Sequence, residues 1–231
     1  MGFKINTVVN FLKEHKQLFV FLVLMSLFRS AVADWYTVPS GSMQPTIQVG
    51  DRIIVNKMAY DLRFPFTNVS LASLDKPKHG EIVVFESKAA NLRLIKRVVG
   101  LPGDVVTMQN NIITVNGQKL TYHALDNKKV QTDSIHVNYF SEKIGNITHR
   151  INIGNSATNQ LINFGPVTVP KGHYLVLGDN RHHSADSRVY GFIPHHELRG
   201  KATGIAFSVD YDNYYIPRKE RLFQNIYVSN L

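Results

Sequence analysis

The stretch Leu92–Asp104 reads LRLIKRVVGLPGD, an apolar and basic run that stops at a Gly-Leu-Pro-Gly-Asp turn. Side chains alternate between the two faces of a strand, so the even-numbered residues share one face and the odd-numbered residues the other. The odd-numbered face mixes arginines with apolar groups, which is typical of a half-exposed face. The even-numbered face is apolar except for Lys96. The run predicts a strand that carries a lysine on its apolar face.

Lys96 has two interpretations. Burial disfavours the charged amine and lowers its pKa from ~10.4 toward the ~7–8 that suits a general base. Such a shift costs ~4 kcal/mol of stability, and a cost of that size favours a functional reason for the burial. Alternatively, a lysine at a strand edge lifts its amine into water along its flexible stem. Alternation along the strand leaves both interpretations open.

Outward from this strand, the chain continues in short apolar runs separated by turn residues. Asn116-Gly117 follows one run and is a strong hairpin signal. Long amphipathic helical patterns are scarce, so we expect a mainly β protein built on antiparallel sheets. The other expected strands are residues 52–55, 81–85, 112–115 and 174–177.

Residues 108–166 differ from their surroundings, because they are rich in Asn, Thr, His and Gln and have weaker apolar periodicity. We interpret them as a polar lobe inserted into the main β domain. The expected organisation is a cytoplasmic N-terminus (1–16), a membrane anchor (17–36), a first part of the β core (37–107), the lobe (108–166) and a second part of the core (167–231).

The N-terminal segment carries lysines and then the uncharged run Leu18–Phe28, LFVFLVLMSLF. Extended from Gln17 to Ala33 it would rise ~25 Å as a helix, enough for a short membrane anchor with Arg29 near its end. Trp35 and Tyr36 would then form an aromatic belt. A cleavable signal peptide ending at Ala31-Val32-Ala33 fits equally well, and a buried core helix is the third possibility.

The amino-acid composition excludes several kinds of site and partner. The 231-residue chain has no cysteine, which excludes disulfides, thiolate metal sites and cysteine nucleophiles. The net charge of +9 suits an anionic membrane surface or nucleic acid. The basic residues are scattered and no nucleic-acid motif is present, so we expect no nucleic-acid partner.

After the apolar segment comes Pro39–Thr46, PSGSMQPT. It places two serines around a glycine between two prolines, which fits either a plain linker or a nucleophile held on a stiff turn.

Four segments occur in one order: SGSMxPT at 40–46, GDxIxVxK at 50–57, KRVVGLPGD at 96–104 and GDNRxxSxDSRxxG at 178–191. Together they resemble type I signal peptidase, the membrane-bound serine protease that removes signal peptides from exported proteins. The resemblance spans residues 29–210 apart from the polar lobe. It implies a signal-peptidase-like β fold after one N-terminal membrane helix, with the catalytic domain outside the cytoplasmic membrane.

The resemblance also implies residue roles. Ser42 corresponds to the nucleophile and Lys96 to its general base, a Ser–Lys dyad working through an acyl-enzyme. Ser40 corresponds to the side-chain oxyanion donor, beside the backbone N–H of Ser42. Ser184 corresponds to the serine that orients the lysine. The expected supporting residues are Asp179, Asn180, Asp186 and Arg188, and Arg181 belongs to the same segment.

On the substrate side, the resemblance implies an extended peptide added beside the strands that flank the site. Small side chains at the first and third positions before the cut would fit shallow apolar pockets, which gives Ala-x-Ala specificity. The expected pocket residues are Val38, Met43, Leu94 and Ile95. We expect signal peptides and a bilayer with anionic phospholipid as partners, and neither a metal nor a cofactor.

Rival interpretations remain. His182 and His183 lie close to Asp179 and Asp186 in sequence and suggest a Ser-His-Asp site, although exposed loop histidines are the simpler explanation. Lys57 and Lys88 are rival bases. A non-catalytic anchored peptide-binding β domain and a self-cleaving Ser–Lys regulator are the alternative functions.

Overall fold

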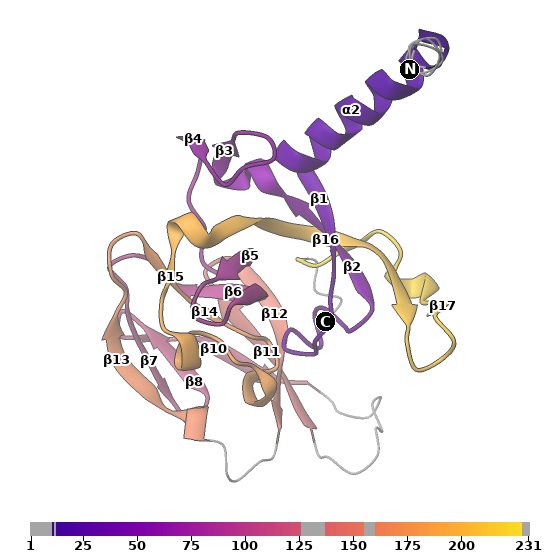
Figure 1. Cartoon of the computed structure of the whole chain (residues 1–231). Coiled ribbons are helices and arrows are strands. Elements are labelled where there is room, and N and C mark those ends of the chain that lie inside the picture. Colours follow the sequence, from indigo (N-terminus) through magenta and orange to yellow (C-terminus); the bar gives the residue numbers. More distant parts are fainter. Residues whose placement is uncertain (1–10, 12, 126–136, 155–159, 228–231) are drawn as a thin grey trace.

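The structure is a computed structural model that describes residues 11, 13–125, 137–154 and 160–227. Its body is built almost entirely from strands, and every ladder between named strands in this described part is antiparallel. This confirms the predicted mainly β, antiparallel class. Figure 1 shows the strands gathered into one body from which a single helix projects.

The largest sheet has the order β1-β2-β16-β5-β6-β14-β15, with β17 and β18 added along β16. Its long central strand β16 runs across the body in Figure 1. The strands of this sheet are β1 (Ala33–Thr37), β2 (Asp51–Asn56), β5 (Ile82–Ser87), β6 (Leu92–Gly100), β14 (His173–Leu177), β15 (Ile193–Pro194), β16 (Leu198–Asp210), β17 (Ile216–Pro217) and β18 (Gln224–Asn225).

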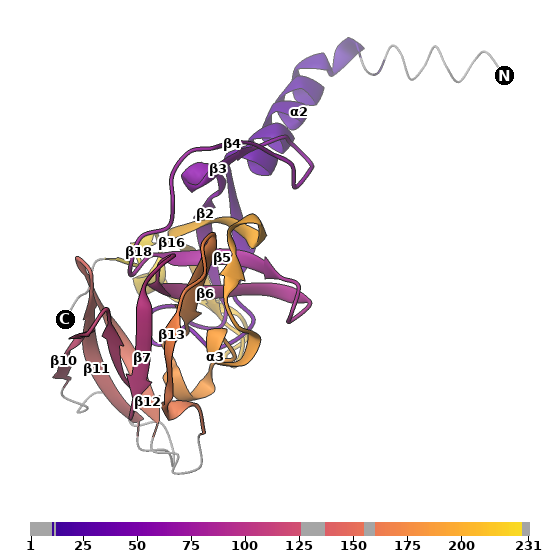
Figure 2. The same cartoon turned by 90° about the vertical axis from the view of Figure 1, so that its left-hand side faces the viewer.

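Three smaller sheets complete the described strands. They have the orders β13-β7-β8-β9, β10-β11-β12 and β3-β4. Their strands are β3 (Asp61–Arg63), β4 (Ser70–Ser73), β7 (Val105–Gln109), β8 (Ile112–Val115), β9 (Gln118–Lys119), β10 (Thr121–Ala124), β11 (Val137–Ile144), β12 (Ile147–Gly154) and β13 (Phe164–Thr168). In Figure 2 the sheet that contains β10, β11 and β12 lies at the end of the body away from the projecting helix.

The short helical elements are single turns. They are η1 (Lys57–Ala59), η2 (Gln160–Ile162), η3 (Arg181–His183), α3 (Ser187–Tyr190), η4 (His195–Glu197) and η5 (Lys219–Arg221).

The expected strands formed where the sequence placed them. The predicted hairpin at Asn116-Gly117 joins β8 to β9, and both turn residues have positive φ (51° and 80°), as a tight two-residue hairpin turn requires. The expected polar lobe, residues 108–166, begins inside β7 and ends inside β13, which pair with each other. Part of that lobe, residues 126–136 and 155–159, lies outside the described residues.

The buried core divides into three clusters around the sheets. One contains Val38, Met43 and Ile47 from the turn after β1 together with Ile53, Val84 and Ile205 from the main sheet. A second contains Val83, Phe85 and Val98, and a third contains Val99, Val106 and Met108. The turn after β1 is therefore packed into the core at several points, which fixes its position relative to β6.

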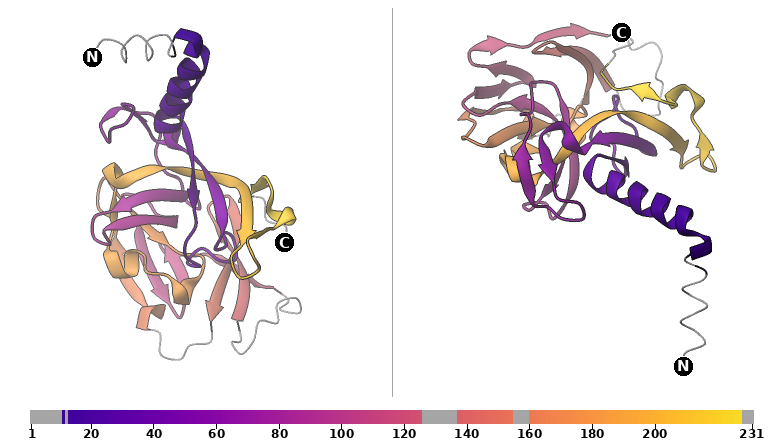
Figure 3. Two further views of the ribbon diagram at one scale, coloured as in Figure 1. Left: turned by 45° about the vertical axis from the view of Figure 1, so that its right-hand side comes forward. Right: turned by 90° about the horizontal axis from the view of Figure 1, so that it is seen from above.

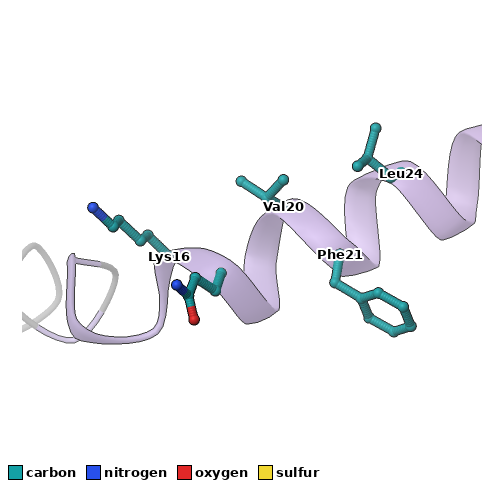
Figure 4. A pocket seen from close by; sticks show the side chains of 5 residues that line it. Lys16, Val20, Phe21 and Leu24 are labelled. Carbon is teal, nitrogen blue, oxygen red and sulfur yellow. The ribbon is translucent and has the colours of Figure 1, made fainter.

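The projecting helix is α2 (Lys16–Ala31), and none of its residues is buried. Figure 3 shows it standing clear of the strands in two further directions. Its exposed side chains include Phe21, Leu24 and Phe28, each at least half exposed. Figure 4 shows Lys16, Val20, Phe21 and Leu24 lining a shallow apolar hollow on this helix, and none of the expected site residues borders it.

The expected membrane anchor at 17–36 is wrong at its C-terminal end. The helix stops at Ala31, and Ala33–Thr37 form β1 because their backbone groups pair with β2. Tyr36 also packs against the core instead of joining Trp35 in an aromatic belt. Over the described part of the chain, no helix combines the length and apolar character that a membrane crossing requires. The expected cytoplasmic segment 1–16 falls mostly outside the described residues.

Candidate active site

The turn after β1 and the strand β6 bring together the two residues that the sequence singled out as a dyad. Lys96 Nζ lies 2.7 Å from Ser42 Oγ and donates a second hydrogen bond to the carbonyl oxygen of Ile95 at 3.0 Å. The two residues are 54 positions apart in the chain. A hydroxyl and an amine at this distance exchange a proton readily, so the pair has the geometry of a nucleophile and its base.

Lys96 is 2% exposed, and it forms no ion pair with any residue of the described structure. Burial lowers the pKa of Lys96 to about 8, while the more distant charges of Asp186 and Asp179 oppose that shift. With this pKa about a tenth of the amines are uncharged at pH 7, and about half at pH 8. Of the two interpretations left open by the sequence, the structure matches the buried amine.

The turn that carries Ser42 is held by the loop after β14. Asn180 donates its backbone N–H to the carbonyl oxygen of Ser42 at 3.1 Å and its side-chain amide to that of Gly41 at 3.0 Å. The N–H of Ser42 has no hydrogen-bond partner among the described residues. Ser40 is exposed on the same turn. The Ser42 N–H is therefore available as a donor beside Ser42 Oγ, and the oxyanion role of Ser40 stays a prediction.

The loop Gly178–Arg188 contains the remaining expected supporting residues. Asp186 forms a two-point ion pair with Arg188 and accepts the backbone N–H of Gly178. Burial would raise the pKa of Asp186, but its bonds to Arg188 outweigh that effect and lower it. The carboxylate stays charged and ties the two ends of the loop together.

Ser184 is buried against this loop at a point of close approach to Ser42. A side chain on Gly178 would overlap both the Ser184 side chain and the carbonyl oxygen of Ser42, so only glycine fits there. The Ser184 Oγ has no partner at hydrogen-bond geometry, although it is close enough to Asp186 to help lower the pKa of that carboxyl. No hydrogen bond joins Ser184 to Lys96 within the described structure, so its orienting role stays a prediction.

Asp179 belongs to a buried ionic cluster directly behind the dyad. Arg97, the residue after Lys96, forms a two-point ion pair with Asp179 at 2.8 and 2.6 Å, and Thr46 donates its hydroxyl to the same carboxylate. Burial would raise the pKa of Asp179, but the Arg97 charge outweighs it and lowers the pKa. The pair links β6, the turn after β1 and the loop after β14.

The sequence interpretation missed Arg97 and its neighbours. It placed Arg97 on a half-exposed face, whereas the side chain is 1% exposed. That expectation was wrong because burial changes along β6 rather than across it: the strand is exposed at Leu92 and Arg93 and fully buried from Lys96 onward. A carboxylate from a distant segment compensates Arg97, and a strand pattern contains no information about that partner.

Two strands of the expected lobe extend the cluster. Glu142 on β11 pairs with Arg181, and His149 on β12 lies 3.2 Å from Glu142 and 3.7 Å from Asp179. All three side chains are at most 3% exposed. Burial lowers the pKa of His149, so the imidazole is neutral. The sequence offered only one hint of these contacts, the placement of Arg181 in the same segment as Asp179.

Three of the four expected pocket residues gather in one place. Val38 and Met43 are buried in the first core cluster, and Ile95 packs against it. Leu94 points to the other face of β6 and packs against the second cluster, so the structure does not bring it to the other three. Tyr36 joins the group instead.

The rival residues have other partners. His182 lies 3.2 Å from Asn111, and His183 is exposed. The carboxylate of Asp179, which a Ser-His-Asp site would need, is occupied by Arg97. The Lys57 amine donates to the carbonyl oxygen of Arg29 at 3.0 Å, and Lys88 is exposed. Neither lysine is hydrogen-bonded to Ser42.

Comparison with known proteins gives consistent results. The family model described as "Signal peptidase, peptidase S26" matches residues 11–207. A signal peptidase I from Buchnera aphidicola subsp. Schizaphis graminum is 33% identical, over 87% of this chain and 76% of that protein. A signal peptidase I from Pseudomonas fluorescens is 34% identical, over 84% of this chain and 71% of that protein.

Among solved structures, a signal peptidase I from Enterococcus faecalis V583 is 30% identical to this chain. The match covers 57% of this chain and 100% of that one, with a TM-score of 0.36.

Proposed function

The chain belongs to the signal peptidase I family of serine proteases, which remove signal peptides, and on that premise we propose that it cleaves exported preproteins with a Ser42–Lys96 dyad. The observation that carries the proposal is the 2.7 Å contact between Ser42 Oγ and the buried amine of Lys96. A lysine with an ordinary pKa would be charged and unable to accept a proton, whereas burial brings this pKa to about 8.

In the acylation step, neutral Lys96 accepts the Ser42 hydroxyl proton as Oγ attacks the carbonyl carbon of the scissile bond. The carbonyl oxygen becomes an oxyanion, which the Ser40 hydroxyl and the Ser42 N–H stabilise. Each such donor typically contributes a factor of ~10²–10³. Protonated Lys96 then gives its proton to the leaving amine, and the C–N bond breaks to leave an acyl-enzyme on Ser42.

Deacylation uses the same groups in the reverse order. Lys96, neutral again, removes a proton from a water molecule, and the resulting hydroxide attacks the ester carbonyl. The same two donors stabilise the second oxyanion. Lys96 then returns the proton to Ser42 Oγ as the ester bond breaks, which releases the new carboxyl end of the signal peptide.

The substrate binds as an extended strand beside the active site, with the first and third residues before the cut in the apolar pocket of Val38, Met43 and Ile95. Val38 and Met43 are buried and Ile95 packs against them, so we expect a shallow pocket that favours alanine. The preference for Ala-x-Ala thus follows from steric exclusion of larger side chains.

The exposed apolar side chains of the helix α2 attach the catalytic domain to the outer side of the cytoplasmic membrane. No other described element covers these side chains, which supports this role. Anionic phospholipid suits the net charge of +9. Val23→Glu, which places a charge midway along α2, should reduce flotation of the full chain with anionic vesicles.

The test of the proposed function is a preprotein cleavage assay in detergent or lipid. Ser42→Ala and Lys96→Ala should each lower the rate by at least about a thousandfold. His182→Ala and His183→Ala are the matched controls, and most of the activity should remain in both. Full activity in Lys96→Ala would exclude the dyad.

A further inference from the structure

Two strands that flank the dyad each have one unpaired edge. β1 pairs only with β2 in the described structure. β6 pairs with β5 along Leu92–Arg97, but β14 covers its other edge only from Arg97 onward. The second edge of residues 92–96 is therefore open, and it ends at the buried Lys96.

An arginine on one open strand contacts a tyrosine on the other. The Arg93 guanidinium stacks over the Tyr36 ring at 4.2 Å from the ring centre. Three strands, β2, β16 and β5, separate β1 from β6 in the sheet order, so this contact requires the sheet to curl until the two open edges face each other. The Arg93–Tyr36 pair thus spans the gap between them.

The pair is part of a row of charges with a positive excess. Arg93 and Arg199 both lie 2.8 Å from Glu86, on the adjacent strand β5. Burial would raise the pKa of Glu86, but the two arginines outweigh it and lower the pKa. Two cations therefore face one anion, and the Arg93 side chain is 42% exposed.

The position of Arg93 along β6 indicates which residues of a bound peptide would reach the Arg93–Tyr36 pair. Arg93 lies three residues before Lys96, about 10 Å along a strand. The pocket residue Ile95 lies between them, so a peptide whose last residue before the cut is at Ser42 runs past Ile95 toward Arg93. β14 occupies the edge in the opposite direction. Residues three to five positions before the cut would therefore reach the pair.

We propose that Arg93, held on Tyr36 across the gap, is a specificity-determining residue that favours an acidic side chain and disfavours lysine or arginine three to five positions before the cleavage site. This inference rests on the proposed function and deepens it. The recognised chemistry is a carboxylate placed on a guanidinium whose ring contact leaves hydrogen-bond donors free.

The test uses full-length protein and peptides with one Ala-x-Ala cleavage site that differ in a single residue. Asp, Gln or Lys is placed in turn at the third, fourth and fifth positions before the cut, and kcat/KM is measured for each peptide. The wild type should prefer Asp to Lys by about fivefold at one of these positions. High salt should reduce that ratio, because the charges are partly exposed.

Arg93→Glu should reverse the preference, and Arg93→Gln should abolish it. Arg150→Glu, at an exposed arginine on β12, is the matched control and should keep the wild-type ratio. A ratio of two substrates on one enzyme is independent of how much protein is folded, so instability of a variant does not obscure the result. An Arg93→Glu enzyme with the wild-type preference, or a wild type indifferent to charge at all three positions, would overturn the inference. If the wild type cleaves none of the peptides, the proposed function itself fails.

Discussion

Lys96 and Arg97 are neighbours on one strand, and the structure treats their charges in opposite ways. Both side chains are nearly inaccessible to water, at 2% and 1% exposure. Arg97 is matched by a two-point ion pair with Asp179. Lys96 contacts a hydroxyl and a carbonyl oxygen but no carboxylate. Equal burial thus gives one fixed positive charge and one amine that is easily deprotonated.

The difference shows how a fold can lower the pKa of one buried amine while the neighbouring charge is fully paired. A buried charge is stable only when a partner compensates its lost hydration. Withholding that partner from Lys96 lowers its pKa from an ordinary value near 10.5 to about 8, which corresponds to about 3 kcal/mol. The alternation of a strand then lets the next residue use a fully paired charge to hold the surrounding segments together.

The largest effect on the free energy of unfolding is expected from breaking the ion pair between Arg97 and Asp179. Arg97→Met leaves the Asp179 carboxylate buried without its cation, which should lower the free energy of unfolding by about 3–5 kcal/mol. Urea denaturation at neutral pH measures this change. The double variant Arg97→Met/Asp179→Leu removes both charges and should recover more than half of the loss. A single variant that loses less than about 1 kcal/mol would show that the pair is not a stabilising support.

The same substitution one residue earlier should have the opposite sign. Lys96→Met removes the cost of the buried amine, so it should abolish cleavage yet raise the free energy of unfolding at neutral pH by up to about 3 kcal/mol. Lys88→Met, at an exposed lysine, is the control and should leave stability nearly unchanged.

The stability gain of Lys96→Met should depend on pH in one direction. Below pH 8 the amine is protonated in both the folded and the unfolded chain, and the folded chain carries the full cost. Between about pH 8 and 10.5 the unfolded chain still binds a proton that the folded chain has released, so wild-type stability rises with pH. The advantage of Lys96→Met should therefore shrink across that window. An advantage that stays constant would contradict a depressed pKa.

Much of the fold could be predicted because its determinants are local. Short apolar runs between turn residues identified β2, β5, β6, β8 and β14, and Asn116-Gly117 identified a hairpin. The end of the N-terminal helix could not be predicted in this way. Residues 33–37 (ADWYT) follow the helix almost directly, and their pairing with β2, a contact with residues 52–56, makes them a strand.

The candidate site also contains residues that the sequence could identify and residues that only the folded chain brings together. Ser42 and Lys96 were identified from sequence order and lie in contact, and Asp179, Asn180 and Asp186 all lie in the loop that supports them. The contributions of Glu142 and His149 were missed, because they come from β11 and β12 and meet Arg181 and Asp179 only in the folded chain. The direction of Leu94, away from the other pocket residues, likewise depends on how both faces of β6 are covered.

The pH dependence of kcat/KM for cleavage of a preprotein-derived peptide without ionisable side chains near the cut tests the central claim most directly. If neutral Lys96 is the base, kcat/KM should rise about tenfold per pH unit on the acidic side and level off above about pH 8, the pKa of the buried amine. A rate that is constant from about pH 6 to 9, or one that keeps rising beyond pH 10, would contradict the assignment of Lys96 as an amine prepared by burial to act as the base.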